Sequence, residues 1–174
     1  MTVADGPRTV VVDTNVLINL SHLDRLDLLA ALEGYKFVAP DFVVTEVTVP
    51  EHAQKLAVAL EQGHLRQEPI VGGEIATYGE LKQVMGKGEA ACLAMAEARG
   101  WLVASDERRR VLRHAGERLG PGRILNTPGI LVLAIRTGAI SVEEADQYKA
   151  ILEKKRFKMK FASFRDVVSR FAER

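Results

Sequence analysis

The sequence predicts an α/β protein: a three-layer α/β/α sandwich whose central parallel sheet has four to five strands, followed by C-terminal helices. Short apolar runs, typical of strands buried on both faces of a parallel sheet, alternate with longer segments of helical periodicity. Two of these runs end at an acid that leads into a helical segment. The 174 residues, 47% of them hydrophobic, suffice for one well-buried core, so we expect a single domain over residues 1–174.

Four strands are expected, at residues 9–13, 36–39, 101–105 and 123–126, with helices in most of the intervals. The first is an uninterrupted β-branched run that stops at Asp13 and passes into a helical pattern over residues 16–20. The third ends at Ser105 and Asp106, before a helix over residues 107–114. Residues 141–174 are expected to form a helical extension beyond the core.

The segments between the strands place two glutamates on apolar helix faces. A helix over residues 42–47, capped by Asp41, would put Phe42, Glu46 and Val49 on one stripe. A helix over residues 86–96 would group Glu89 with apolar neighbours, including Cys92. Residues 51–61 have an amphipathic helical pattern and residues 62–73 have little pattern, so we expect a helical hairpin over the cleft there.

Four acids thus occupy costly or unusual positions. Asp13 and Asp106 follow strands at the carboxyl edge of the sheet, where open α/β sheets bind their ligands, although each alone is more often a helix N-cap. An ionised Glu46 or Glu89 on an apolar face needs a partner, although the first turn of a helix also favours an anion such as Glu89. A shared Mg²⁺ or Mn²⁺ would explain all four, and it indicates metal-dependent phosphodiester hydrolysis.

The same residues carry a resemblance to a known family. VVDTNVLINL, VVTEV, GKGEAACLAMA and LVASDERRR follow one another in the order of the four acidic motifs of the PIN-domain ribonucleases, over residues 10–135. The resemblance implies a PIN-like fold and an acidic quartet that binds the metal: Asp13, Glu46, Glu89 and Asp106. It also implies supporting roles for Asn15 and Ser105, and for Glu107, which stands where family members often carry a second, shorter acid.

The C-terminal part resembles a group of stand-alone prokaryotic PIN proteins that includes VapC-type toxins. This implies an endoribonuclease, the toxin of a toxin–antitoxin pair, with RNA as substrate, a cognate antitoxin protein as partner and a homodimeric assembly. By the same analogy, the RNA products would carry 5′-phosphate and 3′-hydroxyl ends.

Charge is unevenly distributed along the chain. Residues 149–174 hold nine Lys or Arg against three acids, whereas residues 1–148 hold fifteen against twenty. We expect RNA to bind a cluster of arginines beside Asp106, namely Arg108, Arg109, Arg110 and Arg113. A second candidate for contact with a phosphate backbone is a basic stretch of the tail interleaved with Phe157 and Phe161, namely Lys154, Lys155, Arg156, Lys158 and Lys160. The tail lysines are more simply a solvated face, or face an acidic partner or a second subunit, and the tail phenylalanines are more simply packing residues: Phe157, Phe161, Phe164 and Phe171.

Other classes of protein are less well supported. Cys92, the single cysteine, is expected to be a core residue, and the four histidines lack the spacing of a zinc site. No apolar run is long enough to cross a bilayer, so we expect a cytoplasmic protein. The main alternative is a non-catalytic RNA- or protein-binding module in which the acids only cap helices. A phosphatase acting through an aspartyl phosphate ranks last, because Asn15 stands where that chemistry needs an acid.

Overall fold

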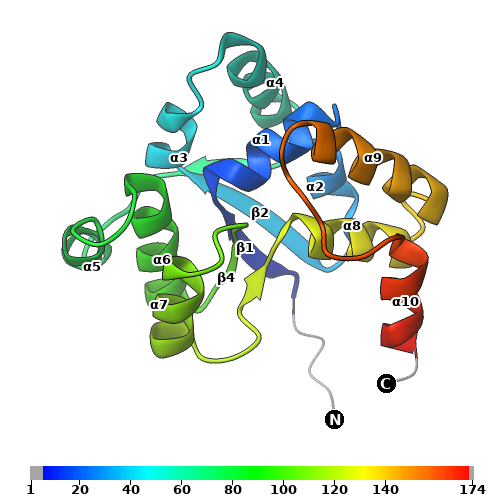
Figure 1. Cartoon of the computed structure of the whole chain (residues 1–174). Coiled ribbons are helices and arrows are strands. Elements are labelled where there is room, and N and C mark those ends of the chain that lie inside the picture. Colours follow the sequence, from blue (N-terminus) through cyan, green and yellow to red (C-terminus); the bar gives the residue numbers. More distant parts are fainter. Residues whose placement is uncertain (1–5, 173–174) are drawn as a thin grey trace.

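The central sheet has five parallel strands in the order β3-β2-β1-β4-β5, as predicted for the fold class (Figure 1). The structure, a computed structural model, describes residues 6–172. The strands are β1 (Arg8–Val12), β2 (Tyr35–Pro40), β3 (Arg66–Glu68), β4 (Leu102–Ala104) and β5 (Ile124–Leu125). β2 and β3 lie on one side of β1, and β4 and β5 lie on the other, so the strand order reverses between β1 and β4.

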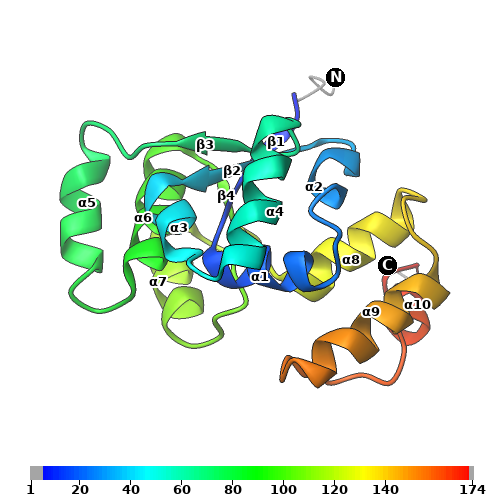
Figure 2. The same cartoon turned by 90° about the horizontal axis from the view of Figure 1, so that it is seen from above.

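Helices cover both faces of this sheet (Figures 1 and 2). On one face α6 lies against β1, β2 and β4, and α3, α5 and α7 pack on α6. On the other face lie α1, α2 and α8, with α4 packed on α1 and with α9 and α10 outermost. The helices are α1 (Thr14–His22), α2 (Leu28–Ala31), α3 (Asp41–Glu46), α4 (Pro50–Glu61), α5 (Glu74–Leu81), α6 (Lys87–Arg99), α7 (Arg110–Leu119), α8 (Thr127–Arg136), α9 (Val142–Lys154) and α10 (Phe164–Ala172).

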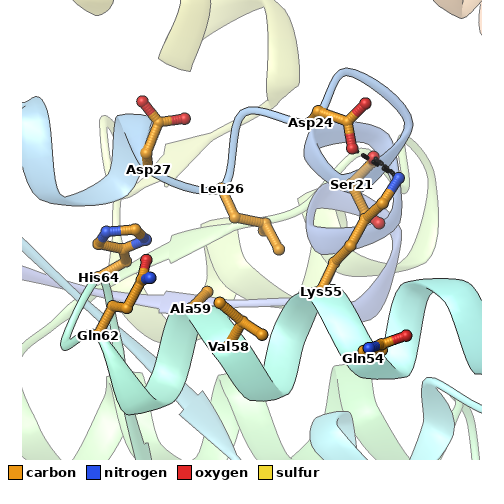
Figure 3. Close-up of a pocket in the computed structure, with 10 residues that line it drawn as sticks. All are labelled: Ser21, Asp24, Leu26, Asp27, Gln54, Lys55, Val58, Ala59, Gln62 and His64. Atoms are coloured by element: carbon orange, nitrogen blue, oxygen red, sulfur yellow. Dashed lines mark hydrogen bonds and ion pairs between the residues drawn. The ribbon is translucent and has the colours of Figure 1, made fainter.

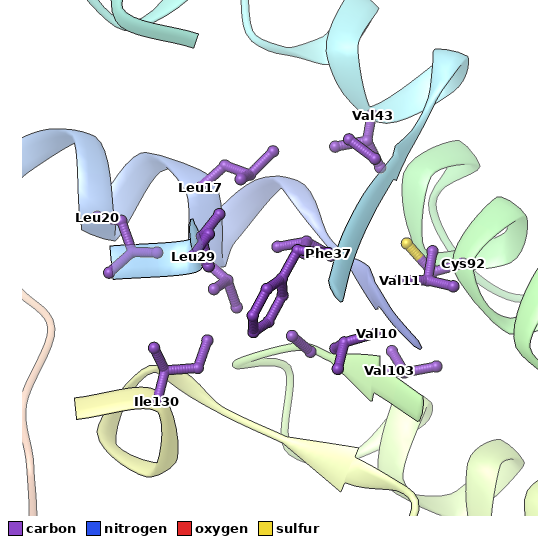
Figure 4. Packing of buried hydrophobic residues seen from close by; sticks show 14 of the residues in the cluster. Val10, Val11, Leu17, Leu20, Leu29, Phe37, Val43, Cys92, Val103 and Ile130 are labelled. Carbon is purple, nitrogen blue, oxygen red and sulfur yellow. The ribbon is translucent and has the colours of Figure 1, made fainter. Parts of the chain in front are cut away.

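The core lies between the sheet and the two helical layers (Figure 4). Val10, Val11 and Val12 are completely buried, which explains why the second half of β1 is apolar at successive positions, without alternation. Cys92 is also completely buried and is a free thiol, so its prediction as a core residue is confirmed. None of the helices within residues 6–172 is long and apolar enough to span a membrane.

The prediction for residues 62–73 was wrong. Only the first arm of the expected helical hairpin forms, as α4, and the chain then enters the edge strand β3. The three residues of β3 are charged or polar and largely exposed, so they carry no apolar alternation from which a strand can be recognised.

The helix after β2 begins one residue earlier than expected and does not reach Val49. Pro40, not Asp41, is the N-cap of α3, and the Asp41 carboxylate accepts a hydrogen bond from the Gln67 side chain. Because α3 ends at Glu46, Val49 lies outside the helix and is 52% exposed. At the C-terminus, α9 and α10 follow the core. The predicted single domain covered residues 1–174, of which 1–5 and 173–174 lie outside the described residues. The end of the predicted 141–174 extension lies outside them as well.

Candidate active site

The carboxyl ends of β1 and β4 lie side by side where the sheet reverses its order. In open α/β sheets this reversal leaves a crevice in which ligands bind. Asp13 directly follows β1, and Ser105 and Asp106 directly follow β4, so two of the predicted acids stand at this position.

Asp13 is almost completely buried, at 2% exposure. One carboxylate oxygen accepts a hydrogen bond from the Thr14 N–H at 2.7 Å and the other accepts one from the Ser105 hydroxyl at 3.1 Å. The residue therefore serves as the N-cap of α1, as expected for an Asp before a helix. Capping explains its position, but it leaves a buried negative charge with no positive partner.

The environment of Asp13 opposes its ionisation. The pKa of its carboxyl group is raised to about 7: burial is the largest cause, the negative charges of Glu89 and Glu46 add to the rise, and the hydrogen bonds from Thr14 and Ser105 oppose it. Near neutral pH this carboxyl is therefore half protonated unless a cation compensates its charge.

Glu46 is an exposed residue at the end of α3, so the prediction of a buried stripe was wrong. Its carboxylate is nonetheless fixed, because it accepts hydrogen bonds from the Thr14 hydroxyl at 2.6 Å and the Gly88 N–H at 2.9 Å. A Cβ atom at Gly88 would lie 2.4 Å from Glu46 Oε2. Glycine at this position lets the start of α6 approach the carboxylate.

Glu89 is half-buried in the first turn of α6, as predicted, and its carboxylate accepts a weak hydrogen bond from the Gly86 N–H at 3.4 Å. The structure brings Glu89 together with two other members of the predicted quartet. One cavity of about 330 Å³ is lined by Asp13, Thr14, Asn15, Glu46, Gly86 and Glu89. We call it the acidic cavity.

Asp106, the fourth acid, is directed elsewhere. Its carboxylate accepts hydrogen bonds from the Thr127 N–H at 2.8 Å, the Thr127 hydroxyl at 2.5 Å and the Asn19 amide at 2.9 Å. Burial raises the pKa of Asp106, while these hydrogen bonds and the charge of Arg108 oppose the rise. Asp106 lines a separate niche of about 40 Å³, which also contains Ser105, Glu107, Arg108, Leu112, Ile124, Asn126, Pro128 and Phe157.

Ser105 connects the acidic cavity to this niche, since it lines the niche and donates to Asp13. Its hydroxyl also accepts a hydrogen bond from the Glu107 N–H at 3.2 Å. The Glu107 carboxylate accepts from the Val111 N–H at 2.8 Å, so this side chain holds the start of α7. Asn15 is exposed at the wall of the acidic cavity.

The predicted arginine cluster is exposed at the start of α7. Arg108 lines the niche of Asp106 and its charge acts on that carboxylate. The other three members line neither the niche nor the acidic cavity: Arg109, Arg110 and Arg113.

The donor set of the acidic cavity fits a hard divalent cation. Carboxylate, hydroxyl and amide oxygens are the ligands that Mg²⁺ and Mn²⁺ prefer. Within residues 6–172, no Lys, Arg or His forms an ion pair with Asp13, Glu46 or Glu89. In that same part of the chain, however, no three His, Cys, Asp or Glu side chains are close enough together to hold a metal ion as they stand.

A larger pocket, of about 410 Å³, lies between α4 and the connection from α1 to α2 (Figure 3). Lys55 pairs there with Asp24 at 2.7 Å. None of the four predicted acids lines this pocket, and its walls mix aliphatic and polar side chains. The acidic cavity is therefore the better candidate for chemistry, although it is smaller.

Sequence reasoning missed several residues that shape the site. Thr127 was missed even though it follows the predicted fourth strand, and the carboxyl ends of parallel strands share one edge. Asn19 gave a weaker signal, as an amide between the apolar residues Ile18 and Leu20, and it is buried. Gly88 and Thr14 had no local signal, because their importance comes from contacts with Glu46, which is distant in sequence.

Comparisons with known proteins identify the family of this chain. A protein-family model described as a PIN domain (DUF3368) matches residues 9–173. No curated protein matches the chain. Among solved structures, a chain in the crystal structure of VapBC2 from Rickettsia felis bound to a DNA fragment from their promoter is similar, with a TM-score of 0.48 and 16% identity, over 68% of this chain and 98% of that chain. Since the family model spans nearly the whole sequence, this protein belongs to the PIN-domain family.

Proposed function

We propose that this protein is a metal-dependent endoribonuclease that hydrolyses phosphodiester bonds of RNA with Mg²⁺ or Mn²⁺. The observation that carries the proposal is the acidic cavity, where Asp13, Glu46 and Glu89 converge from three separate elements and no cation of the described chain compensates them. Membership of the PIN-domain family supports the same conclusion, because the motifs that carry the resemblance supply these acids.

In this proposal Asp13, Glu46 and Glu89 hold the metal, and Asp106 is a fourth acid beside them. A bound divalent ion would supply positive charge that stabilises the developing negative charge on the phosphate and lowers the pKa of a water molecule. The Thr14 hydroxyl and the Gly88 N–H orient the Glu46 carboxylate, and the Ser105 hydroxyl orients Asp13. Thr127 and Asn19 fix Asp106 at the border of the site.

The direct test combines metal binding with RNA cleavage. Titration with Mn²⁺ in a calorimeter should give a heat signal in the wild-type protein that is lost in Asp13→Asn, and Mn²⁺-stimulated cleavage should fall by about 100-fold or more in the variant. Asp166→Asn, the same change at an exposed residue of α10, is the matched control and should retain both properties. Equal cleavage by wild type and Asp13→Asn would contradict the proposal.

One observation favours the second candidate, a non-catalytic RNA- or protein-binding module. No three potential ligands within residues 6–172 are close enough to form a ready-made metal site, and the Asp106 carboxylate already accepts three hydrogen bonds. Binding of RNA without any heat of Mn²⁺ binding and without cleavage would favour this alternative.

We also propose that the protein acts in the cytoplasm as the toxin of a toxin–antitoxin pair, as a homodimer that a cognate antitoxin inhibits. The support is the resemblance of residues 123–141 to the stand-alone prokaryotic group. Expression should then arrest growth in a suitable bacterial host, and co-expression of the protein encoded beside it should relieve the arrest. Light scattering should give twice the mass of the chain, and a monomer would remove the dimer from the proposal.

A further inference from the structure

The segment that follows α9 carries an unusual concentration of positive charge. Five basic residues stand within seven positions, and all are exposed: Lys154, Lys155, Arg156, Lys158 and Lys160. None of the five forms a salt bridge within residues 6–172. Two other basic residues of the C-terminal region are paired, Lys149 with Glu153 and Arg165 with Glu143. We call residues 154–160 the basic arm.

The backbone fixes where the basic arm leaves α9. Arg156 has a φ of 67°, and the Phe157 N–H donates to the Leu152 carbonyl at 2.9 Å, a left-handed ending of the kind that closes many helices. The arm begins the orange-red connection between α9 and α10 in Figure 1. Phe157, the aromatic residue in the middle of the arm, directly follows this left-handed residue.

Phe157 places the basic arm at the candidate active site. It is half-buried, and its side chain lines the niche together with Ser105, Asp106 and Arg108. Leu112, which is 47% exposed, lines the same niche and extends its apolar rim. The niche, at about 40 Å³, is too small for a nucleobase, so a base would lie against the Phe157 and Leu112 rim.

The other phenylalanine interleaved with the basic residues of the tail has a different environment. Phe161 packs edge-on against the fully buried Phe164, with ring centroids 4.9 Å apart. Both phenylalanines pack against the core, as expected from the sequence, and Phe157 in addition borders a predicted catalytic acid.

We infer that the basic arm binds the single-stranded RNA substrate next to the cleavage site, with its cations on the phosphates and Phe157 stacked on an unpaired base beside Asp106. This inference rests on the proposed nuclease function and names the surface that the substrate uses. Cationic side chains around an aromatic ring form the usual platform for single strands, whose bases are free to stack. The arm, together with Arg108, therefore carries RNA binding, rather than the whole arginine cluster of α7.

The experiment measures RNA binding without cleavage. Fluorescence anisotropy of a labelled 12-nucleotide single-stranded RNA in EDTA compares the wild-type protein with the triple variant Lys154→Gln, Lys155→Gln and Lys158→Gln. The matched control is Arg8→Gln, Lys36→Gln and Arg66→Gln, which removes three exposed cations at the amino ends of β1, β2 and β3, the opposite edge of the sheet. At 0.1 M salt we expect about tenfold weaker binding for the arm variant, with a salt dependence shallower by about two in the log–log slope, and little change for the control.

Phe157→Leu tests the stacking separately, because leucine preserves apolar packing without the aromatic face. Binding of single-stranded RNA should weaken about fivefold or more, whereas binding of an abasic strand of equal length should be unchanged. Phe157→Trp should retain binding. Circular dichroism melting confirms that each variant is folded.

The outcomes separate this inference from the proposed function. If the wild-type protein cleaves RNA and the arm variant binds it with unchanged affinity and salt dependence, the inference is wrong while the nuclease proposal stands. If the wild-type protein binds RNA through the arm but never cleaves it, the nuclease proposal alone fails. If the wild-type protein does not bind RNA, both fail.

Discussion

Two buried carboxylates in this molecule have opposite environments. Asp13, at the carboxyl edge of the sheet, is 2% exposed and has no cationic partner, and burial raises its pKa to about 7. Glu74, at the start of α5, is 5% exposed, and its hydrogen bonds with Arg99 lower its pKa. The contrast shows that burial alone does not mark a site: a buried acid paired with an arginine stabilises the fold, whereas one surrounded by other acids needs a ligand.

Arg99 compensates the negative charge of Glu74. Its guanidinium donates to Glu74 and to Glu68 at 2.6 Å each, and it lies over the Trp101 ring at 4.7 Å from the centroid. This cluster ties α5, α6 and β3 together without any added ion. The acidic cavity contains no such cation among the described residues that line it. Without a bound metal, electrostatic repulsion between its carboxylates should therefore destabilise the fold there, and not at Glu74.

The largest expected effect is a pH-dependent gain of stability in Asp13→Asn. The raised pKa means that the folded protein retains a proton that the unfolded chain releases near 3.8, so Asp13 costs stability as pH rises from about 4 to about 7. In EDTA at pH 8, the neutral variant should be more stable than wild type by on the order of 4 kcal/mol, and the difference should disappear at pH 4. Urea unfolding at both pH values measures this.

Glu74→Gln is the matched control for that experiment and should have the opposite sign. The lowered pKa of Glu74 gives stability that is present above the ordinary value of 4.5 and is lost as pH falls through the folded-state value. The variant should therefore be less stable at pH 8, by about 2 kcal/mol. Equal effects of the two substitutions at pH 8 would contradict the comparison.

Arg99→Met should have the next largest effect. It leaves Glu74 buried without a counter-charge and should lower the free energy of unfolding by about 3 kcal/mol at pH 7. Adding Glu74→Gln to this variant should restore part of the loss, because the uncompensated charge is then removed. A loss below about 0.5 kcal/mol in chemical denaturation would show that this cluster contributes no more than a surface ion pair.

Gly88→Ala should weaken metal binding more than it alters stability. The new Cβ would lie 2.4 Å from Glu46 Oε2, so the carboxylate must move, whereas alanine favours the helix. We expect about tenfold weaker Mn²⁺ affinity, or about 1.4 kcal/mol, in calorimetry. Gly116→Ala in α7, where the new Cβ meets no atom within 4 Å, is the control and should leave the affinity unchanged. If Gly88→Ala binds Mn²⁺ with wild-type affinity, Glu46 does not take part in metal binding.

Thr127→Val should have the smallest effect. The hydroxyl hydrogen bond to Asp106 is lost while the backbone N–H bond stays, so the pKa of Asp106 should rise further and stability should fall by about 1 kcal/mol. An NMR titration of the Asp106 carboxyl measures the shift. An unchanged pKa would mean that the Thr127 N–H and the Asn19 amide suffice to stabilise the ionised form.

Local sequence patterns predicted much of the carboxyl edge of the sheet, where the candidate active site lies. The strand before Asp13 was predicted because its last three residues, Val10 to Val12, are completely buried apolar residues, and the first turn of α6 at Glu89 followed from the apolar periodicity of residues 86–96. β3 was missed, because a three-residue polar strand at the sheet edge leaves no periodic signal. The exposure of Glu46 was also missed, because the end of α3 depends on where the chain turns toward α4.

The sequence by itself determined the alternating strands and helices, the position of Asp13 and Asp106 after parallel strands, and the excess of positive charge at the C-terminus. These properties follow from periodicity and composition, which are local. Only the tertiary structure decided that Asp13, Glu46 and Glu89 share one cavity, that Asp106 bonds to Thr127, and that Phe157 borders Asp106. Those contacts depend on the order of strands in the sheet and on hydrogen bonds between residues far apart in the chain, and neither can be read from local spacing.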